Sequence, residues 1–520
     1  MSAPAAAVFE EPPFQTIVRN VTTRYLSVAV EMVLGLVTLP FNLHHLGPDA
    51  YGLWMLTAGA TIHFSILDLG YGGAMVKFIA QYRAHGHTRA LNEIASTLFY
   101  LFLAFGIVAY LVVIGLAFNL EHVFKLTAGQ AEIGKWILLI IGVNVSLNFP
   151  FSIYGGIVGG FQRYDVNNNI AIVSSIAVAA VNIGVVLLGY GLLPLVAATT
   201  SVRVLTYFLY RRTAFRVFPS LELRLRFFRR ERLRELTGFS VYSSIVDWAN
   251  KLNYELDDVV IGVFLGAAPV AVWAVADRIV SAIQRLTNQA NAVLFPVVVD
   301  SDARQSTDRL QRLLIEGTRL SLASVLPMAL VAYVMADSIV RAWVGPKMLG
   351  AAPVIQILAV TVALRVGNAT STTLLKGAGR VRDVAYVNIV TGLVNLALSA
   401  TLIHWWGLPG VALGTLLPVA CASVFVLFPM ACRRVGLGVG IAFRQAVWPL
   451  FWPAIAAGIA LETVRAALPD SVVALFAEAA FAAVVYLALA VYAIGRLDRA
   501  RYLTKLAELR GRKRHLVPAT

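Results

Sequence analysis

The 520-residue chain has little cysteine, and few of its residues are charged. Its two cysteines, Cys421 and Cys432, fall within one apolar stretch. They offer neither a disulfide framework nor a metal-binding motif, and we interpret them as packing residues. Charged residues make up 14% of the chain, whereas soluble globular proteins carry about 25%. This shortage of charge argues against an ordinary soluble domain.

Hydrophobic residues, by contrast, make up 59% of the chain and gather in repeated runs. A run of about 20 apolar residues can cross a bilayer as an α-helix, and we count about fourteen such runs. The sequence therefore predicts an all-α integral membrane protein with about fourteen transmembrane helices. It has no phosphate-binding glycine loop and no HExxH motif. We expect neither catalytic residues nor a bound metal or cofactor.

The formal net charge of +15 could indicate nucleic-acid binding. The arginines, however, gather in connections after even-numbered apolar runs, above all in residues 211–237 and in the tail 496–520. Cytoplasmic connections of membrane proteins are enriched in Lys and Arg in this way. We therefore predict that both termini lie in the cytoplasm. The expected partners of the basic segments are membrane lipids, and no nucleic acid.

Residues 211–237 form the longest basic connection, in which arginines alternate with Leu221, Leu223, Leu225 and Phe227. The alternation predicts an interfacial segment that lies on an anionic leaflet and helps to fix the topology. The alternative is that this segment gathers an anionic lipid substrate.

Two sequence matches indicate an internal repeat. Leu46–Trp54 matches Leu265–Trp273 at a separation of 219 residues, and Gly160–Arg163 matches Gly377–Arg380 at 217. Roughly six runs fall in each repeat, and repeats with an even number of helices are parallel, related by an axis along the membrane normal. The predicted organisation is an N-tail (1–16), an N-lobe (17–210), a basic connection (211–237), a C-lobe (238–431), two appended helices (432–495) and a basic tail (496–520).

The segment 239–296 carries charges where lipid-facing apolar residues would be expected. Asp247, Lys251 and Asp258 share one side of its first half, and Arg278 and Arg285 share one side of its second half, because they recur at three- and four-residue steps. A charge at the bilayer centre costs about 2.5–3.5 kcal/mol. These faces are therefore expected to look inward, into protein or water.

Short motifs follow one another along the chain in this order: Leu46–Trp54, Leu67–Gly70, Phe264–Gly266, Trp273–Arg278, Pro296, Gly377–Arg382, Asn388, Asn395 and Val411–Thr415. Together with the repeat they resemble the polysaccharide (O-antigen type) flippases of the multidrug/oligosaccharidyl-lipid/polysaccharide exporter superfamily. The resemblance covers most of the chain, from about residue 17 to 495.

This resemblance implies a V-shaped bundle of two six-helix lobes around a central cavity. It also implies alternating-access transport of undecaprenyl-diphosphate-linked oligosaccharide across the bacterial cytoplasmic (inner) membrane, for cell-surface polysaccharide such as lipopolysaccharide O-antigen. A polysaccharide polymerase and glycosyltransferases are its implied partners.

The candidates for binding the diphosphate of such a substrate are Lys251, Arg278 and Arg285, with Arg319 and Arg365 as secondary candidates. A guanidinium group offers a fork that matches phosphate oxygens. The alternative is that these bases only pair with neighbouring acids. Arg24 and Arg203 lie near the expected cytoplasmic ends of their helices, and we expect both to snorkel to the interface.

Four acids, Glu31, Asp247, Asp257 and Asp258, are candidates for lining the cavity and for coupling transport to H⁺ or Na⁺. The alternative is that they are counter-ions of the arginines. Late in the second run, Asp68 precedes three glycines, Gly70, Gly72 and Gly73. Glycine permits a helix to bend, so this segment is predicted to be a hinge that Asp68 caps. The alternative is that it contacts the substrate directly.

Two rival functions are open at this point. A cation-coupled multidrug exporter of the same superfamily would favour a mainly acidic and aromatic cavity. A membrane glycosyltransferase or polymerase would need a large outer loop with acids, and the longest expected outer connection, around Asn119 to Lys135, is short. We therefore predict a transporter and not an enzyme.

Overall fold

The computed structural model describes residues 14–237, 256–292, 294–465 and 472–514. Helices dominate this part of the chain, and it contains no strand. Within it, eleven helices are long and apolar enough to cross a membrane. The all-α membrane class predicted from the sequence is therefore confirmed.

Two of these eleven helical segments cover more than one predicted span, because each bends at a glycine. Helix α1 (Phe14–Ile62) changes direction at Gly47, where φ is +81°, and α16 (Val381–Cys421) does so at Gly407, where φ is +58°. Positive φ is readily adopted only by glycine. Most of a further predicted span, 238–264, lies outside the described residues.

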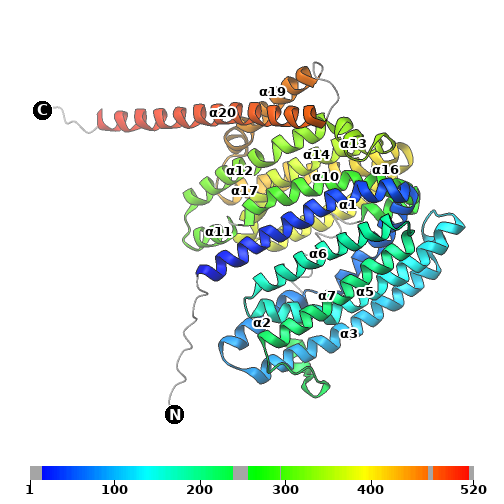
Figure 1. Cartoon of the computed structure of the whole chain (residues 1–520). Helices are drawn as coiled ribbons and strands as arrows, with labels where there is room; N and C mark the ends of the chain where they lie inside the picture. The colour runs from blue at the N-terminus through cyan, green and yellow to red at the C-terminus, as the bar shows by residue number, and fades with distance from the viewer. Residues whose placement is uncertain (1–13, 238–255, 293, 466–471, 515–520) are drawn as a thin grey trace, which may run out of the picture. The chain divides into compact units, whose positions relative to one another are not determined.

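The chain divides into two compact units, one ending at Ala274 and the other beginning at Val275. The first unit contains α1, η1 (His63–Asp68), α2 (Tyr71–Ala84), α3 (Thr88–Phe118), α4 (Leu120–Val123), α5 (Ala128–Gly160), α6 (Tyr164–Leu187), α7 (Leu192–Val217), η2 (Leu225–Phe227) and α9 (Asp257–Phe264). Helices α3, α5 and α7 pack side by side, and α6 lies between α1 and α7 (Figure 1).

The core of the first unit forms where α2, α3 and α5 meet, around Met75, Phe102 and Ile153. Helices α3 and α5 approach closely at Gly106, where a side chain would overlap the carbonyl oxygen of Ser146. This approach needs glycine, because the obstacle is backbone and cannot move aside.

Helix α9 and the start of α10 (Ala267–Ala292) pack within the first unit. A Cβ on Gly52 of α1 would overlap the carbonyl oxygen of Ala267, and one on Gly262 of α9 would overlap Leu56. The backbone amide of Lys125 also donates to the carbonyl oxygen of Gly262 (3.2 Å). These close contacts are why the division falls after Ala274.

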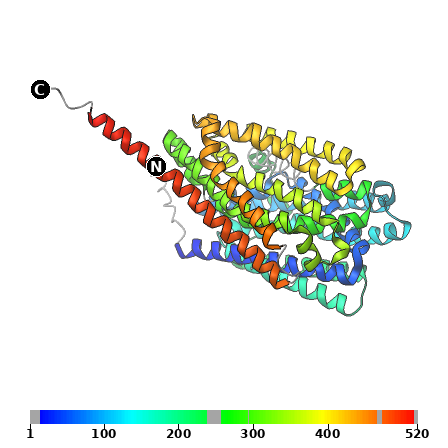
Figure 2. The same ribbon diagram turned by 90° about the horizontal axis from the view of Figure 1, so that it is seen from above.

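The second unit contains most of α10 (Ala267–Ala292), followed by α11 (Leu294–Ala303), α12 (Thr307–Val334), α13 (Ala336–Trp343), η3 (Pro346–Met348), α14 (Ala351–Gly367), α15 (Ala369–Gly377), α16, the π-helix η4 (Ala422–Leu427), α17 (Phe428–Arg434), α18 (Val439–Ala442), the π-helix η5 (Phe443–Val447), α19 (Trp448–Arg465) and α20 (Val472–Arg514). Helix α12 packs against both α14 and α19. Helix α20 runs beside α19 and continues past it toward the C terminus (Figures 1 and 2).

Candidate functional site

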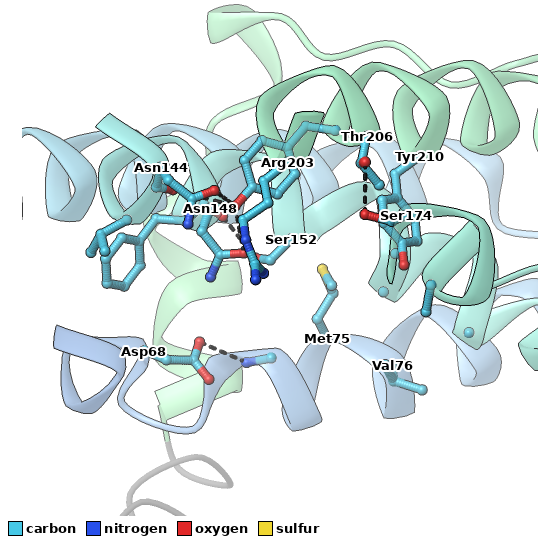
Figure 3. Close-up of a pocket in the computed structure, with 18 of the residues that line it drawn as sticks. Asp68, Met75, Val76, Asn144, Asn148, Ser152, Ser174, Arg203, Thr206 and Tyr210 are labelled. Carbon is cyan, nitrogen blue, oxygen red and sulfur yellow. Dashed lines mark hydrogen bonds between the residues drawn. The ribbon is translucent and has the colours of Figure 1, made fainter. Parts of the chain in front are cut away.

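The first unit contains an open cavity of about 800 Å³, which we call the polar cavity. Its walls come from α1, η1, α2, α5, α6 and α7. Its lining is rich in amides and hydroxyls and includes two acids and one arginine: Glu31, Asp68, Asn144, Asn148, Ser152, Ser174, Ser175, Arg203, Thr206, Tyr207 and Tyr210. Figure 3 shows most of these side chains around the open space.

One wall of the polar cavity is a hydrogen-bonded cluster between α5 and α7. The hydroxyl of Tyr207 donates to Oδ1 of Asn144 (2.9 Å) and lies 3.4 Å from Oδ1 of Asn148. Residues four apart share a helix face, which places Asn148 beside Asn144 and Arg203 beside Tyr207. The guanidinium of Arg203 points into the cavity (Figure 3).

The facing wall contains Asp68, at the end of η1 (Figure 3). Its Oδ1 accepts a hydrogen bond from the backbone amide of Gly72 (3.2 Å), in the first turn of α2. Between them the chain reverses through Leu69 and Gly70, with φ of +49° and +72°. Asp68 therefore fastens the break between η1 and α2.

The glycines after Asp68 differ in what the fold requires of them. Gly70 needs its positive φ, and a Cβ on Gly72 would lie 3.1 Å from Oδ2 of Asp68. Gly73 has open space around it. The backbone therefore requires glycine at position 70, leaves little space for a side chain at position 72 and has space for one at position 73.

Glu31 reaches the polar cavity from α1, where Ser27 Oγ donates to its Oε1 (3.3 Å). Its carboxyl also lies within electrostatic reach of the Tyr210 hydroxyl. Asp257 and Asp258 lie in the first turn of α9, and the side chain of Asp258 faces Gly59 of α1. Asp247 and Lys251 fall outside the described residues.

The second unit contains an arginine cluster, made of Arg278 and Arg285 on α10 and Arg365 on α14. All three guanidinium groups lie within electrostatic reach of a single carboxylate, that of Asp277, which also accepts a hydrogen bond from Ser281 Oγ (3.1 Å). The Nε of Arg278 is buried and has no hydrogen-bond partner in the described part of the chain. Three arginines thus gather around the carboxylate of Asp277.

Arg319, a secondary candidate for diphosphate binding, is packed between helices of the second unit. It is 8% exposed, its Nε donates to the carbonyl oxygen of Gln445 (2.8 Å), and its Nη1 lies 3.3 Å from Oδ1 of Asp498. These contacts tie α12 to η5 and α20. The position is that of a residue that holds helices together.

Sequence reasoning missed most of the polar cavity. Arg203 was expected to snorkel to the interface, but it lines the cavity, and Asn144, Asn148 and Tyr207 were not singled out. A usable signal exists, because polar residues four apart recur within the otherwise apolar α5 and α7.

Two family profiles match the chain. The family described as "Polysaccharide biosynthesis protein" matches residues 17–301, more than half of the chain, and the family described as MatE matches residues 251–401. No curated protein matches the chain.

Several solved structures share its fold. The lipid II flippase MurJ, in an inward closed conformation, covers 92% of this chain and 100% of its own, with a TM-score of 0.72 and 12% identity. An inward-facing multidrug resistance MATE family transporter of the MOP superfamily covers 78% of this chain and 94% of its own, with a TM-score of 0.67 and 16% identity. A MOP superfamily transporter from Pyrococcus furiosus covers 84% and 99%, with a TM-score of 0.57 and 15% identity.

At sequence identities of 12–16% the solved structures show only that the fold is shared, whereas the family profile shows which family the chain belongs to. Both agree with the resemblance in the sequence motifs. The chain is a multi-pass membrane protein that belongs to the polysaccharide biosynthesis protein family, and it shares the fold of a MOP superfamily transporter and of a lipid II flippase.

Proposed function

We propose that the protein flips undecaprenyl-diphosphate-linked oligosaccharide across the bacterial cytoplasmic membrane, for the synthesis of a cell-surface polysaccharide. The observation that carries the proposal is the arginine cluster. The guanidinium groups of Arg278, Arg285 and Arg365 gather around the carboxylate of Asp277. A diphosphate carries negative charge and can accept forked hydrogen bonds from arginine.

The cost of placing these charges supports a role for them. An arginine at mid-membrane costs about 2.5–3.5 kcal/mol, and such residues are normally retained for function. The buried Nε of Arg278 has no hydrogen-bond partner in the described part of the chain, so it is a donor that a substrate phosphate could use.

The polar cavity adds the second half of the proposal. Amide and hydroxyl groups such as those of Asn148, Ser152 and Tyr207 can exchange hydrogen bonds with sugar hydroxyls. One of the proteins with a similar fold is a lipid II flippase, which is consistent with a cargo that has a polar head and a lipid tail. We propose alternating access, with the tail remaining in the bilayer and with both termini in the cytoplasm.

The test is surface polysaccharide export in cells of the source organism that lack the native copy. Replacing Arg278, Arg285 and Arg365 by alanine together should abolish export while the protein remains in the membrane. The matched control replaces Arg304, Arg309 and Arg312, which are exposed at the N-terminal end of α12 and just before it, and should leave export intact. Unchanged export in the cluster variant would reject the assignment.

A second candidate is a cation-coupled multidrug exporter, and the two carboxylates of the polar cavity favour it. Glu31 and Asp68 could attract a lipophilic cation or bind the coupling H⁺ or Na⁺. Several neighbours in fold are MATE family transporters. Extrusion of a cationic dye that is lost in Glu31→Gln, together with unaltered polysaccharide export, would favour this function over the first.

A further inference from the structure

The connection after α7 is fastened along α3 by side-chain hydrogen bonds, and we call residues 219–230 the basic strap. Nδ2 of Asn92 donates to the carbonyl oxygen of Ser220 (2.9 Å), and the amide of Glu222 donates back to Oδ1 of Asn92 (3.1 Å). Ser96 Oγ bridges the carbonyl oxygen of Glu222 (3.1 Å) and the amide of Arg224 (3.3 Å). The amide of Arg229 donates to Thr97 Oγ1 (3.0 Å).

These hydrogen bonds hold the backbone of the basic strap against α3 and determine which of its side chains point away from the protein. Asn92, Ser96 and Thr97 are at most 5% exposed, and Leu221 is 4% exposed in the first unit's core. Buried polar groups must find partners, and here they find the backbone of the strap. The arginine side chains are left on the outer surface: Arg224, Arg226, Arg229 and Arg230 are all exposed.

Nearby acids neutralise little of this charge. Glu93 and Glu235 are both engaged by Arg232, at 3.3 and 3.0 Å, and Tyr82 bonds to Glu235 and Arg232 as well (2.8 Å each). Arg224 and Arg226 share the one carboxylate of Glu222, at 3.3 and 3.0 Å. A shared, partly exposed carboxylate leaves the surface positively charged.

The strap lies just outside the expected level of the lipid headgroups. The exposed apolar face of α3 begins at Leu103, with Ile107 and Leu111 further along. Thr97, where the strap ends, precedes Leu103 by six residues, about 9 Å along a helix at 1.5 Å per residue. The headgroup layer is about 5–7 Å thick on each side of the hydrocarbon, so the strap's backbone lies at its outer edge and long arginine side chains can extend into it. Leu225, flanked by Arg224 and Arg226, is 67% exposed, a pattern typical of an interfacial segment.

We propose that the basic strap is a binding site for the phosphate-bearing headgroups of anionic membrane lipids. Arg224, Arg226, Arg229 and Arg230 hold the phosphates, and Leu225 lies among the headgroups. The site is independent of the transported substrate, because the strap lies outside both the polar cavity and the arginine cluster.

Native mass spectrometry of the full-length protein, titrated with phosphatidylglycerol or phosphatidylcholine, tests the proposal. The wild type should prefer phosphatidylglycerol by about tenfold, and the variant Arg224→Gln/Arg226→Gln/Arg229→Gln/Arg230→Gln should lose that preference. The control Arg304→Gln/Arg309→Gln/Arg312→Gln/Arg433→Gln removes as many exposed arginines from the second unit and should keep it. Equal behaviour of the two variants, or displacement of the lipid by excess inorganic phosphate, would overturn the lipid assignment.

A second measurement does not depend on the fourfold variant folding. Leu225→Cys in a Cys421→Ser background is labelled with an environment-sensitive fluorophore, since Cys432 is fully buried. In nanodiscs that contain phosphatidylglycerol, lipids with a nitroxide on the headgroup should quench the label. Emission typical of water, with no quenching, would show that the strap does not touch the membrane.

Discussion

The break between η1 and α2 gives a prediction that separates a structural role of Asp68 from a chemical one. Asp68→Ala removes the side-chain acceptor of the Gly72 amide, whereas Asp68→Asn keeps an oxygen in the same position and removes only the charge. Losing a side-chain cap of this kind costs about 1 kcal/mol, or roughly a fivefold change in the population of the capped conformation.

The assay is translocation of a fluorescent lipid-linked oligosaccharide in proteoliposomes, with thermal unfolding of the same samples. If Asp68 acts as a cap, Asp68→Ala should lower translocation about fivefold and Asp68→Asn should stay within about twofold of the wild type. If both variants lose activity equally while their stability differs, the carboxylate charge is what matters and the capping argument is wrong.

Three further predictions concern packing, the cavity wall and pH. Gly106→Ala should lower the free energy of unfolding by about 1–3 kcal/mol, because the added methyl group presses on the backbone of Ser146. Gly115→Ala, on the same helix but with open space around it, should raise the free energy of unfolding by up to about 1 kcal/mol. Equal unfolding temperatures of the two variants in detergent would contradict this prediction. Tyr207→Phe should keep the thermal unfolding temperature within a few degrees of the wild type. It should weaken oligosaccharide binding severalfold, because Asn144 loses the hydroxyl that orients its side chain. Unchanged affinity would show that Asn144 and Tyr207 do not belong to the binding site. Burial and the hydrogen bond to Glu235 raise the pKa of Tyr82. The stability that the protonated phenol contributes is therefore present below about pH 10 and is lost as the pH rises through the raised pKa. In Tyr82→Phe the free energy of unfolding, measured from pH 8 to 12, should fall less steeply than in the wild type.

The sequence was sufficient to predict the helical membrane class, because runs of about 20 apolar residues have few other outcomes. It was less informative about which helices pack together. Close packing at Gly52 and Gly262 holds α9 and the start of α10 against α1. Such packing depends on which faces meet in space, which a periodic pattern does not specify.

The arginine cluster could be predicted in part from the sequence, whereas the polar cavity could not. Arg278 and Arg285 stand out in the sequence because charge in an apolar run is costly. Asn144, Asn148 and Tyr207 do not, since an isolated amide or phenol is compatible with ordinary packing, and only the fold shows that α5 and α7 bring them to one wall. Arg203 was misjudged because it was expected near the end of its helix, whereas α7 continues to Val217, so Arg203 lies near the middle of the helix and lines the polar cavity.

The account depends most on what the three arginines around Asp277 hold. The most direct measurement is the affinity of the purified protein for undecaprenyl-diphosphate-linked sugar against the monophosphate-linked form, in the wild type and in Arg278→Gln/Arg285→Gln/Arg365→Gln. We predict that the wild type binds the diphosphate form at least about tenfold more tightly, since each charge-assisted hydrogen bond is worth about 1.5–3 kcal/mol, and that the variant binds the two forms alike. The same preference in the variant, or none in the wild type, would contradict the proposed function.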